Sequence, residues 1–364
     1  MDIRKDGDGI SLLKKGKKGL VRVVFSRLGL FILLLLVQVA FLFSSFFRFT
    51  EFLPPILGGT ALFSVLMVLH LINQPIDPTA KITWLIVIML LPVFGALLFI
   101  FVQSEIGHRA EKGRLAQLTE QTRESIPQSP RAMEGLERED PGAAALARYI
   151  RRSGCFPVYD NTQVTFFPMG KDKWERLLRE LEEAREFIFL EYFIIDEGLM
   201  WGKVLEILAR KAAQGVDVRV IYDGTCEFST LPHDYPRRLK KLGIQCKMFA
   251  PIAPFISTHY NYRDHRKILV IDGHTAFTGG VNMADEYIGH VIKFGHWKDV
   301  AVMLKGEAAR SFTLMFLQMW AIDQRELGLD GFLTAPCRFP GRRRGGYWIC
   351  SCSESCRAMK KPAG

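Results

Sequence analysis

The chain has 364 residues, of which 49% are hydrophobic and 24% are charged, a composition that excludes a disordered protein and allows two or three domains. Its net charge of +10 is concentrated at the two ends: residues 1–27 carry eight Lys or Arg against three Asp, and residues 337–364 carry seven against one Glu. The near-neutral middle argues against a nucleic-acid-binding groove. The size of the chain and the spacing of its seven Cys exclude a small disulfide-stabilised domain.

Three apolar runs follow the basic N-terminal tail. Residues 28–47 and 82–102 contain no formal charge and are long enough to cross a bilayer as helices, and residues 56–72 form a shorter third candidate. We therefore predict two or three transmembrane helices within residues 28–104, in a multi-pass protein of the cell membrane. The Lys and Arg of residues 1–27 predict a cytoplasmic tail. Basic residues also follow the last run, so the side of the downstream domain stays open.

Residues 105–142 are polar and are predicted to form a linker, helical in part. The globular part follows over residues 143–330. Residues 187–195 are apolar on both faces, which is typical of a strand covered on both sides. A helical pattern then leads into an alternating strand at 216–222, and this order favours a parallel, right-handed crossover.

Further elements complete an α/β layered domain. The patterns predict helices over residues 174–184 and 307–322, and strands over residues 246–250, 267–271 and near 300–304. Residues 331–364 have neither helical nor strand periodicity and are predicted to form a disordered tail. Three Cys lie close together in that tail, but their spacing departs from that of zinc knuckles and no His follows.

The most informative stretch is 258–289, which contains the pattern H-x-K-x4-D followed by G-G-x-N. The residues of these patterns are His265, Lys267, Asp272, Gly279, Gly280 and Asn282.

This pattern suits chemistry on a phosphate ester. In a strand, His265 and Lys267 point to the same face, because side chains alternate with a period of two. A His can attack phosphorus, and a Lys can neutralise the charge that develops on the phosphate oxygens. Asn282 offers amide donors to the same oxygens, and the two glycines permit a close backbone approach. Asp272 has the opposite parity, which favours a positioning role over direct attack.

Glu191, in the apolar strand at 187–195, is a candidate partner for a site Lys or His. A strand-edge Glu without such a role is an equally good interpretation.

The stretch HRKILVID followed by TGGVN resembles the signature of the phospholipase D superfamily. With LEYFIID and the preceding apolar segment, residues 30–325 resemble bacterial cardiolipin synthases. The resemblance implies an αβα sandwich and a catalytic set of His265, Lys267 and Asp272. Lys267, Asn282, Gly279 and Gly280 would bind the substrate phosphate.

The resemblance also implies a reaction. Two phosphatidylglycerols would be converted to cardiolipin and glycerol through a phosphohistidine intermediate. The partners would be phosphatidylglycerol and membrane lipids in a bacterial cell membrane, with no cofactor, no metal and no nucleic acid.

The family uses two H-x-K-x4-D motifs, whereas here only His265 has both Lys at +2 and Asp at +7. We therefore hypothesise a truncated form whose activity requires a homodimer or a second catalytic half, because a second acid must protonate the departing glycerol oxygen. The alternatives are an inactive membrane-bound fragment, an interaction partner of a full-length synthase, and a hydrolase of the phospholipase D type.

Overall fold

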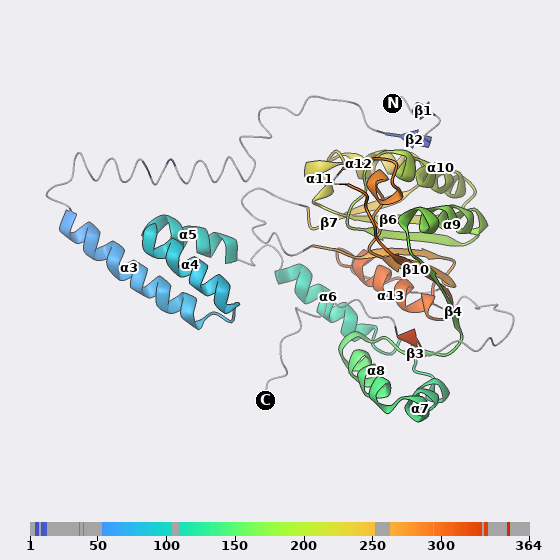
Figure 1. Ribbon diagram of the computed structural model, residues 1–364, viewed down its shortest axis with the longest axis horizontal. Coiled ribbons are helices and arrows are strands. Elements are labelled where there is room, and N and C mark those ends of the chain that lie inside the picture. The colour runs from blue at the N-terminus through green and yellow to red at the C-terminus, as the bar shows by residue number, and fades with distance from the viewer. Residues whose placement is uncertain are drawn as a thin grey trace. The chain divides into compact units, whose positions relative to one another are not determined.

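The computed structural model describes residues 4–6, 9–12, 36, 39, 53–103, 109–251, 263–293, 295–329, 331–333 and 348–349 (Figure 1). The chain divides into two compact units. Residues 1–14, 110–251 and 263–364 make up the first, and residues 15–109 and 252–262 make up the second.

A seven-stranded sheet forms the centre of the first unit. In spatial order its strands are β4 (Thr162–Phe167), β10 (Ala301–Gly306), β9 (Thr275–Gly279), β8 (Lys267–Ile271), β5 (Phe187–Tyr192), β6 (Asp217–Asp223) and β7 (Gln245–Phe249). Strands β5, β6 and β7 are parallel, whereas β8 pairs antiparallel to β5, with Lys267 opposite Tyr192. The first residue of β8 therefore lies at the carboxyl edge of the parallel strands.

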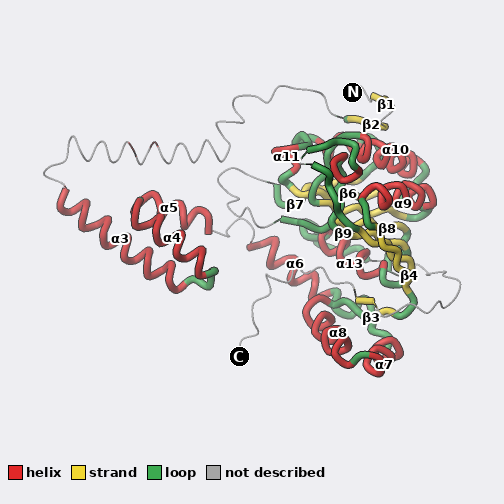
Figure 2. Tube along the Cα trace, in the orientation of Figure 1, coloured by secondary structure: helices red, strands yellow, loops and turns green. Residues whose placement is uncertain are grey.

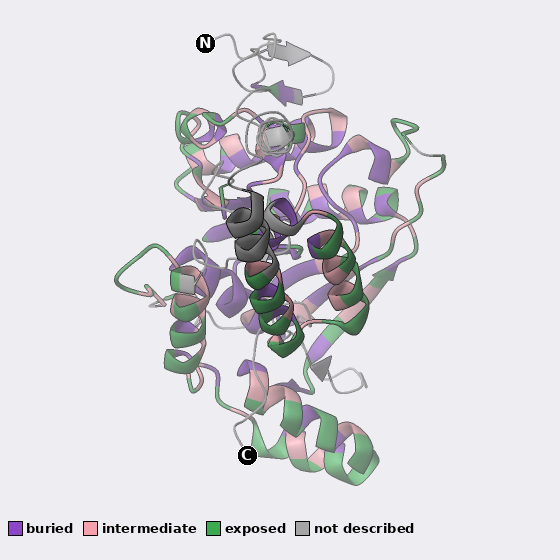
Figure 3. Cartoon of the chain, turned by 90° about the vertical axis from the view of Figure 1, so that its left-hand side faces the viewer, coloured by how far each residue is buried: buried purple, intermediate pink, exposed green. Residues whose placement is uncertain are grey.

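Helices cover both faces of this sheet (Figures 1 and 2). On one face, Leu190 of β5 shares a core with α9 (Gly170–Glu183) and α10 (Leu199–Ala213). On the other face, Phe189 stacks on Phe316 of α13 (Ala309–Trp320) with ring centroids 4.6 Å apart. Buried residues concentrate in the strands between these layers (Figure 3). The predicted αβα arrangement is confirmed.

Shorter elements complete the described residues of this unit. They are β1 (Arg4–Asp6), β2 (Gly9–Ser11), α6 (Arg109–Gln121), α7 (Pro130–Glu139), α8 (Pro141–Gly154), β3 (Val158–Tyr159), α11 (Cys226–Ser229), α12 (Tyr235–Lys240), the 3-10 helix η1 (Asp285–Ile288) and β11 (Trp348–Ile349).

Helices occur in the segment predicted as a linker, helical in part. It contains α6 and α7, and Leu118 of α6 is fully buried. Most of the predicted tail lies outside the described residues. Its described part includes β11, which pairs antiparallel with β3.

The second unit contains α3 (Leu53–Asn73), α4 (Pro78–Leu90) and α5 (Pro92–Gln103). These helices pack around a small apolar core, in which Leu71 and Ile88 are fully buried. Gly95 allows close packing here, because a Cβ at that position would lie 2.6 Å from the carbonyl oxygen of Val87.

The prediction of transmembrane helices is wrong for the residues that the structure describes, since none of their helices is long and apolar enough to cross a membrane. The predicted span at 82–102 is divided, because α4 ends at Leu90 and α5 begins at Pro92, whose ring removes a backbone donor. Each piece is about 20 Å long or less, against a hydrocarbon core of about 30 Å. The multi-pass localisation is overturned with it. The run at 28–47 lies outside the described residues, apart from Leu36 and Val39.

Candidate active site

His265 and Lys267 lie together at the carboxyl edge of the parallel strands. His265 is exposed and lies two residues before β8, whereas Lys267 begins the strand and is only 4% exposed. Both side chains meet the ring of Phe193, which follows β5. The imidazole centroid lies 4.7 Å from that ring, and the Lys267 ammonium lies 5.1 Å from its centroid. Lys267 Nζ also donates to the His265 carbonyl oxygen at 2.6 Å, so the two residues share one small site.

Asn282 reaches the same locality from the loop after β9. The backbone N–H of Ile194, next to Phe193, donates to Asn282 Oδ1 at 3.1 Å. Asn282 Nδ2 donates to the hydroxyl of Tyr287 in η1 at 2.7 Å, and the amide is almost fully buried. These two bonds fix the orientation of the amide. An amide NH2 carries two hydrogens, so the bond to Tyr287 uses one of them.

The two glycines before Asn282 are required by protein packing. A Cβ on Gly279, whose φ is +139°, would lie 2.5 Å from the carbonyl oxygen of Val300. A Cβ on Gly280 would lie 1.9 Å from Asp299 Oδ1. The two glycines therefore allow close packing against Asp299 and Val300, the residues just before β10. Contact of the glycines with a substrate phosphate stays a proposal.

The structure does not bring Asp272 to the His265 site. The five-residue strand β8 separates Asp272 from Lys267 by about 16 Å. The buried Asp272 carboxylate accepts backbone N–H bonds from Arg185, Glu186 and Phe187, at 2.9, 2.8 and 2.9 Å. Asp272 thus holds the turn before β5 at the amino edge of the parallel strands.

Glu191 lies on the face of the sheet opposite Lys267. Its Oε1 is 2.6 Å from Arg266 Nη2, and Arg266 Nε donates to Asp264 Oδ1 at 2.9 Å. Burial raises the pKa of the Glu191 carboxyl well above its usual range; Arg266 opposes the shift and Asp264 adds to it. Glu191 therefore contacts Arg266, which in turn bonds Asp264, and these two residues are the chain neighbours of His265.

The sequence analysis did not identify Lys173, a residue near the site. Lys173 of α9 is fully buried, and its Nζ donates to the Tyr192 hydroxyl at 3.2 Å and to the Val281 carbonyl oxygen at 3.1 Å. The sequence carries one sign of this burial: Lys173 precedes Leu177 and Leu181 at helical spacing, on the apolar face of α9.

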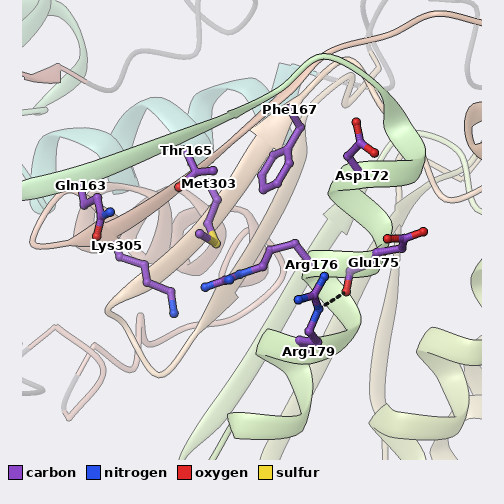
Figure 4. Close-up of a pocket in the computed structure, with 9 residues that line it drawn as sticks. All are labelled: Gln163, Thr165, Phe167, Asp172, Glu175, Arg176, Arg179, Met303 and Lys305. Carbon is purple, nitrogen blue, oxygen red and sulfur yellow. Dashed lines mark hydrogen bonds between the residues drawn. The ribbon is translucent and has the colours of Figure 1, made fainter.

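Other features of the first unit do not add to this site. Across the part of the chain that the structure describes, no group of three His, Cys, Asp or Glu is arranged to hold a metal ion. A pocket of about 400 Å³ lies between β4, β10 and α9 (Figure 4). Arg176 and Lys305 line this pocket, and both pair with Glu180 at 2.6 Å. With Arg179, Asp172 and Glu175 also in the lining, three basic side chains stand against three carboxylates, so the pocket has no net positive charge to hold an anion.

Comparison with known proteins shows the family to which the sequence belongs. Residues 177–320 match the family described as cardiolipin synthase, PLD-like domain, and residues 62–103 match the phospholipase D-nuclease N-terminal family. A cardiolipin synthase of Alkalihalophilus pseudofirmus is 33% identical over 263 residues, covering 71% of this chain and 52% of the relative. An uncharacterized protein of Streptococcus mutans is 50% identical over 267 residues, covering 73% and 58%. The chain belongs to the phospholipase D superfamily.

Within that superfamily the sequence is cardiolipin synthase-like, and the chain spans about half the length of the curated relatives it matches. Among solved structures, NucT from Helicobacter pylori aligns with a TM-score of 0.36 at 14% identity, covering 44% of this chain and 96% of its own. Nuc from Salmonella typhimurium, a phospholipase D family member, aligns with a TM-score of 0.34 at 17% identity, covering 44% and 93%.

Proposed function

We propose that the chain is a phosphatidyltransferase that makes cardiolipin and glycerol from two molecules of phosphatidylglycerol. The observation that carries this proposal is the convergence of His265 and Lys267 on Phe193, in a domain with cardiolipin synthase-like sequence.

His265 is the proposed nucleophile. Its ring nitrogen attacks the phosphorus of one phosphatidylglycerol, the bond from phosphorus to the glycerol oxygen breaks, and glycerol departs. A hydroxyl of a second phosphatidylglycerol then attacks the phosphohistidine, which forms cardiolipin and frees the imidazole. Lys267 and Asn282 hold the non-bridging oxygens while negative charge develops on them. The roles of Gly279 and Gly280 are to let Asn282 enter the site.

The departing glycerol oxygen needs a proton, and the sequence contains a single H-x-K-x4-D motif. We propose that a second His265, from another copy of the chain, or a separate catalytic half donates that proton. If two copies share the site, the rate per mole of chain rises with chain concentration. A rate per mole that is independent of concentration contradicts the homodimer.

The test is product analysis with phosphatidylglycerol in detergent-mixed micelles. The full chain is expected to release cardiolipin and glycerol in equal amounts. His265→Ala removes the nucleophile and should reduce product to background, whereas His290→Ala, an exposed His outside the motif, should leave the rate unchanged. The absence of product from a folded wild-type chain, alone and with the second half, contradicts the proposal and favours an inactive or partner-binding role.

Hydrolysis is a second candidate, because His265 is exposed and water can reach a phosphohistidine there. Phosphatidic acid without cardiolipin would identify a phospholipase D-type hydrolase in the same assay.

A further inference from the structure

Lys173 has a buried amino group whose hydrogen bonds, among the described residues, go only to uncharged groups. Its side chain is 0% exposed, and the groups that accept from Nζ are a hydroxyl and a carbonyl oxygen. Nζ also lies 5.0 Å from the centroid of the Tyr192 ring. A buried charge is unfavourable unless it is paired, and both of these acceptors are uncharged, so burial favours loss of the proton from Lys173.

The two residues that Lys173 contacts are neighbours of Lys267 and Asn282, the residues proposed to bind phosphate. Tyr192, which accepts from Nζ, lies opposite Lys267 in the register of β5 and β8. Val281, the other acceptor, directly precedes Asn282 in the chain. The ammonium therefore lies against the immediate neighbours of Lys267 and Asn282.

Two charged groups act on Lys173 from elements around it. Burial lowers the pKa of Lys173 to about 7; Asp299, before β10, opposes the shift, and Lys267 of β8 adds to it. On β5, burial raises the pKa of the Tyr192 phenol, which therefore stays neutral. Asp299 Oδ1 accepts the Val300 N–H at 2.8 Å, which leaves the carboxylate charge in place, and the pKa of Lys173 stays lowered despite that charge.

A bound phosphodiester would favour the protonated form of Lys173. A negative charge held by Lys267 and Asn282 attracts the nearby ammonium and screens the repulsion between the two lysines. Lys173 is too deeply buried to touch the substrate, so its effect passes through Tyr192, Val281 and the electrostatic potential of the site.

We propose that Lys173 is a positioning residue that places buried positive charge behind the phosphate site and takes up one proton from solvent when a phosphodiester binds at Lys267 and Asn282. This inference rests on the proposed function, because it requires a phosphodiester at those two residues. It adds a proton-coupled step to substrate binding.

The first test measures binding of glycerophosphoglycerol, a soluble phosphodiester whose single negative charge does not change between pH 6 and pH 8. Titration calorimetry of the full chain is performed in the His265→Ala background, so that the imidazole does not contribute. Affinity is expected to fall by up to about tenfold from pH 6 to pH 8, because the neutral lysine must then gain a proton to bind. Buffers with different ionisation enthalpies should report uptake of about one proton at pH 8.

Lys173→Met is the decisive variant, and Lys171→Met, an exposed lysine on the same helix, is its matched control. In the same background, Lys173→Met should bind about tenfold more weakly at pH 6 and lose the pH dependence. Lys171→Met should behave like its parent. Proton uptake on binding can be measured in the His265→Ala protein without any change at Lys173. The proposal therefore stays testable if Lys173→Met folds poorly.

Thermal unfolding without ligand separates this role from a structural one. An apolar side chain removes a buried, unpaired charge, so Lys173→Met is expected to melt at the same temperature as its parent or higher. Equal affinities and equal pH profiles for Lys173→Met and its parent would overturn the inference and leave the proposed function standing. A wild-type chain that binds no phosphodiester would overturn both.

Discussion

The two ends of β8 carry residues of one sequence motif and have opposite characters. At the first end, His265 is exposed and Lys267 lies beside it, both against Phe193. At the other end, Asp272 is buried and is occupied by three backbone N–H groups. The four residues between Lys267 and Asp272 are the apolar strand itself. The spacing of the motif therefore corresponds to the length of a strand, with the proposed reactive residues at its first end and a structural Asp at the other.

The largest expected effect that tests this separation comes from Lys267→Met. The variant keeps the length of the side chain and removes the ammonium, so the transfer rate should fall by about 10²- to 10³-fold. The free energy of unfolding should change by less than about 1 kcal/mol, because the end of β8 keeps its sheet bonds. Product assays and urea unfolding measure the two quantities. Lys298→Met, an exposed lysine, is the control, and wild-type activity in Lys267→Met would contradict the proposed role.

Asp272→Ala should produce the reverse pattern. Three N–H groups lose their acceptor, and Ala is less suited than Asp to the φ of +49° at this position, so the free energy of unfolding should fall by about 3 kcal/mol. Asp272→Asn keeps one acceptor oxygen and should recover part of the loss.

Urea unfolding checks this prediction, with the exposed Asp160→Ala as the control. The transfer rate per folded molecule is expected to persist. If Asp272→Ala abolishes transfer while stability is unchanged, the separation between the two ends of β8 is wrong.

A smaller effect is expected from Glu191, behind the reactive end. Its raised pKa means that the folded protein binds a proton more tightly than the unfolded chain, so this stabilisation is complete at low pH and is lost as pH rises through the folded-state pKa. Glu191→Gln mimics the protonated carboxyl. It should match wild type near pH 5 and exceed it by about 1 kcal/mol near pH 8 in urea unfolding. A variant that is less stable at both pH values would show that the ion pair with Arg266 dominates.

Local sequence patterns predicted the central strands well. The limits of β8 agree with the predicted strand, and β5 forms where the chain is apolar on both faces, because helices cover both sides of the sheet. Strands β4 and β9 were not predicted. At the end of β9, Gly279 pairs with Ala301 and packs closely against Val300, a long-range contact that the local pattern does not reveal.

Predictions from local patterns failed where a single residue or a partner distant in sequence decides the structure. Counting apolar residues over 82–102 gave one long helix, although Pro92 begins a new one. The period of two correctly brought His265 and Lys267 together, but Glu191 proved to face the opposite side of the sheet. Lys173 was missed because its partners, Tyr192 and Val281, are distant in sequence and depend on the order of the strands.

The carboxylate of Asp272 has a consequence for how quickly the chain folds. It bonds residues that are 85 to 87 positions earlier in the sequence, and the pairing of β5 with β8 spans a similar separation. The intervening chain contains α10, β6 and β7, so these contacts close a long loop before they gain stability. Such a high contact order slows folding, and the centre of the sheet should be completed in a late, rate-limiting step.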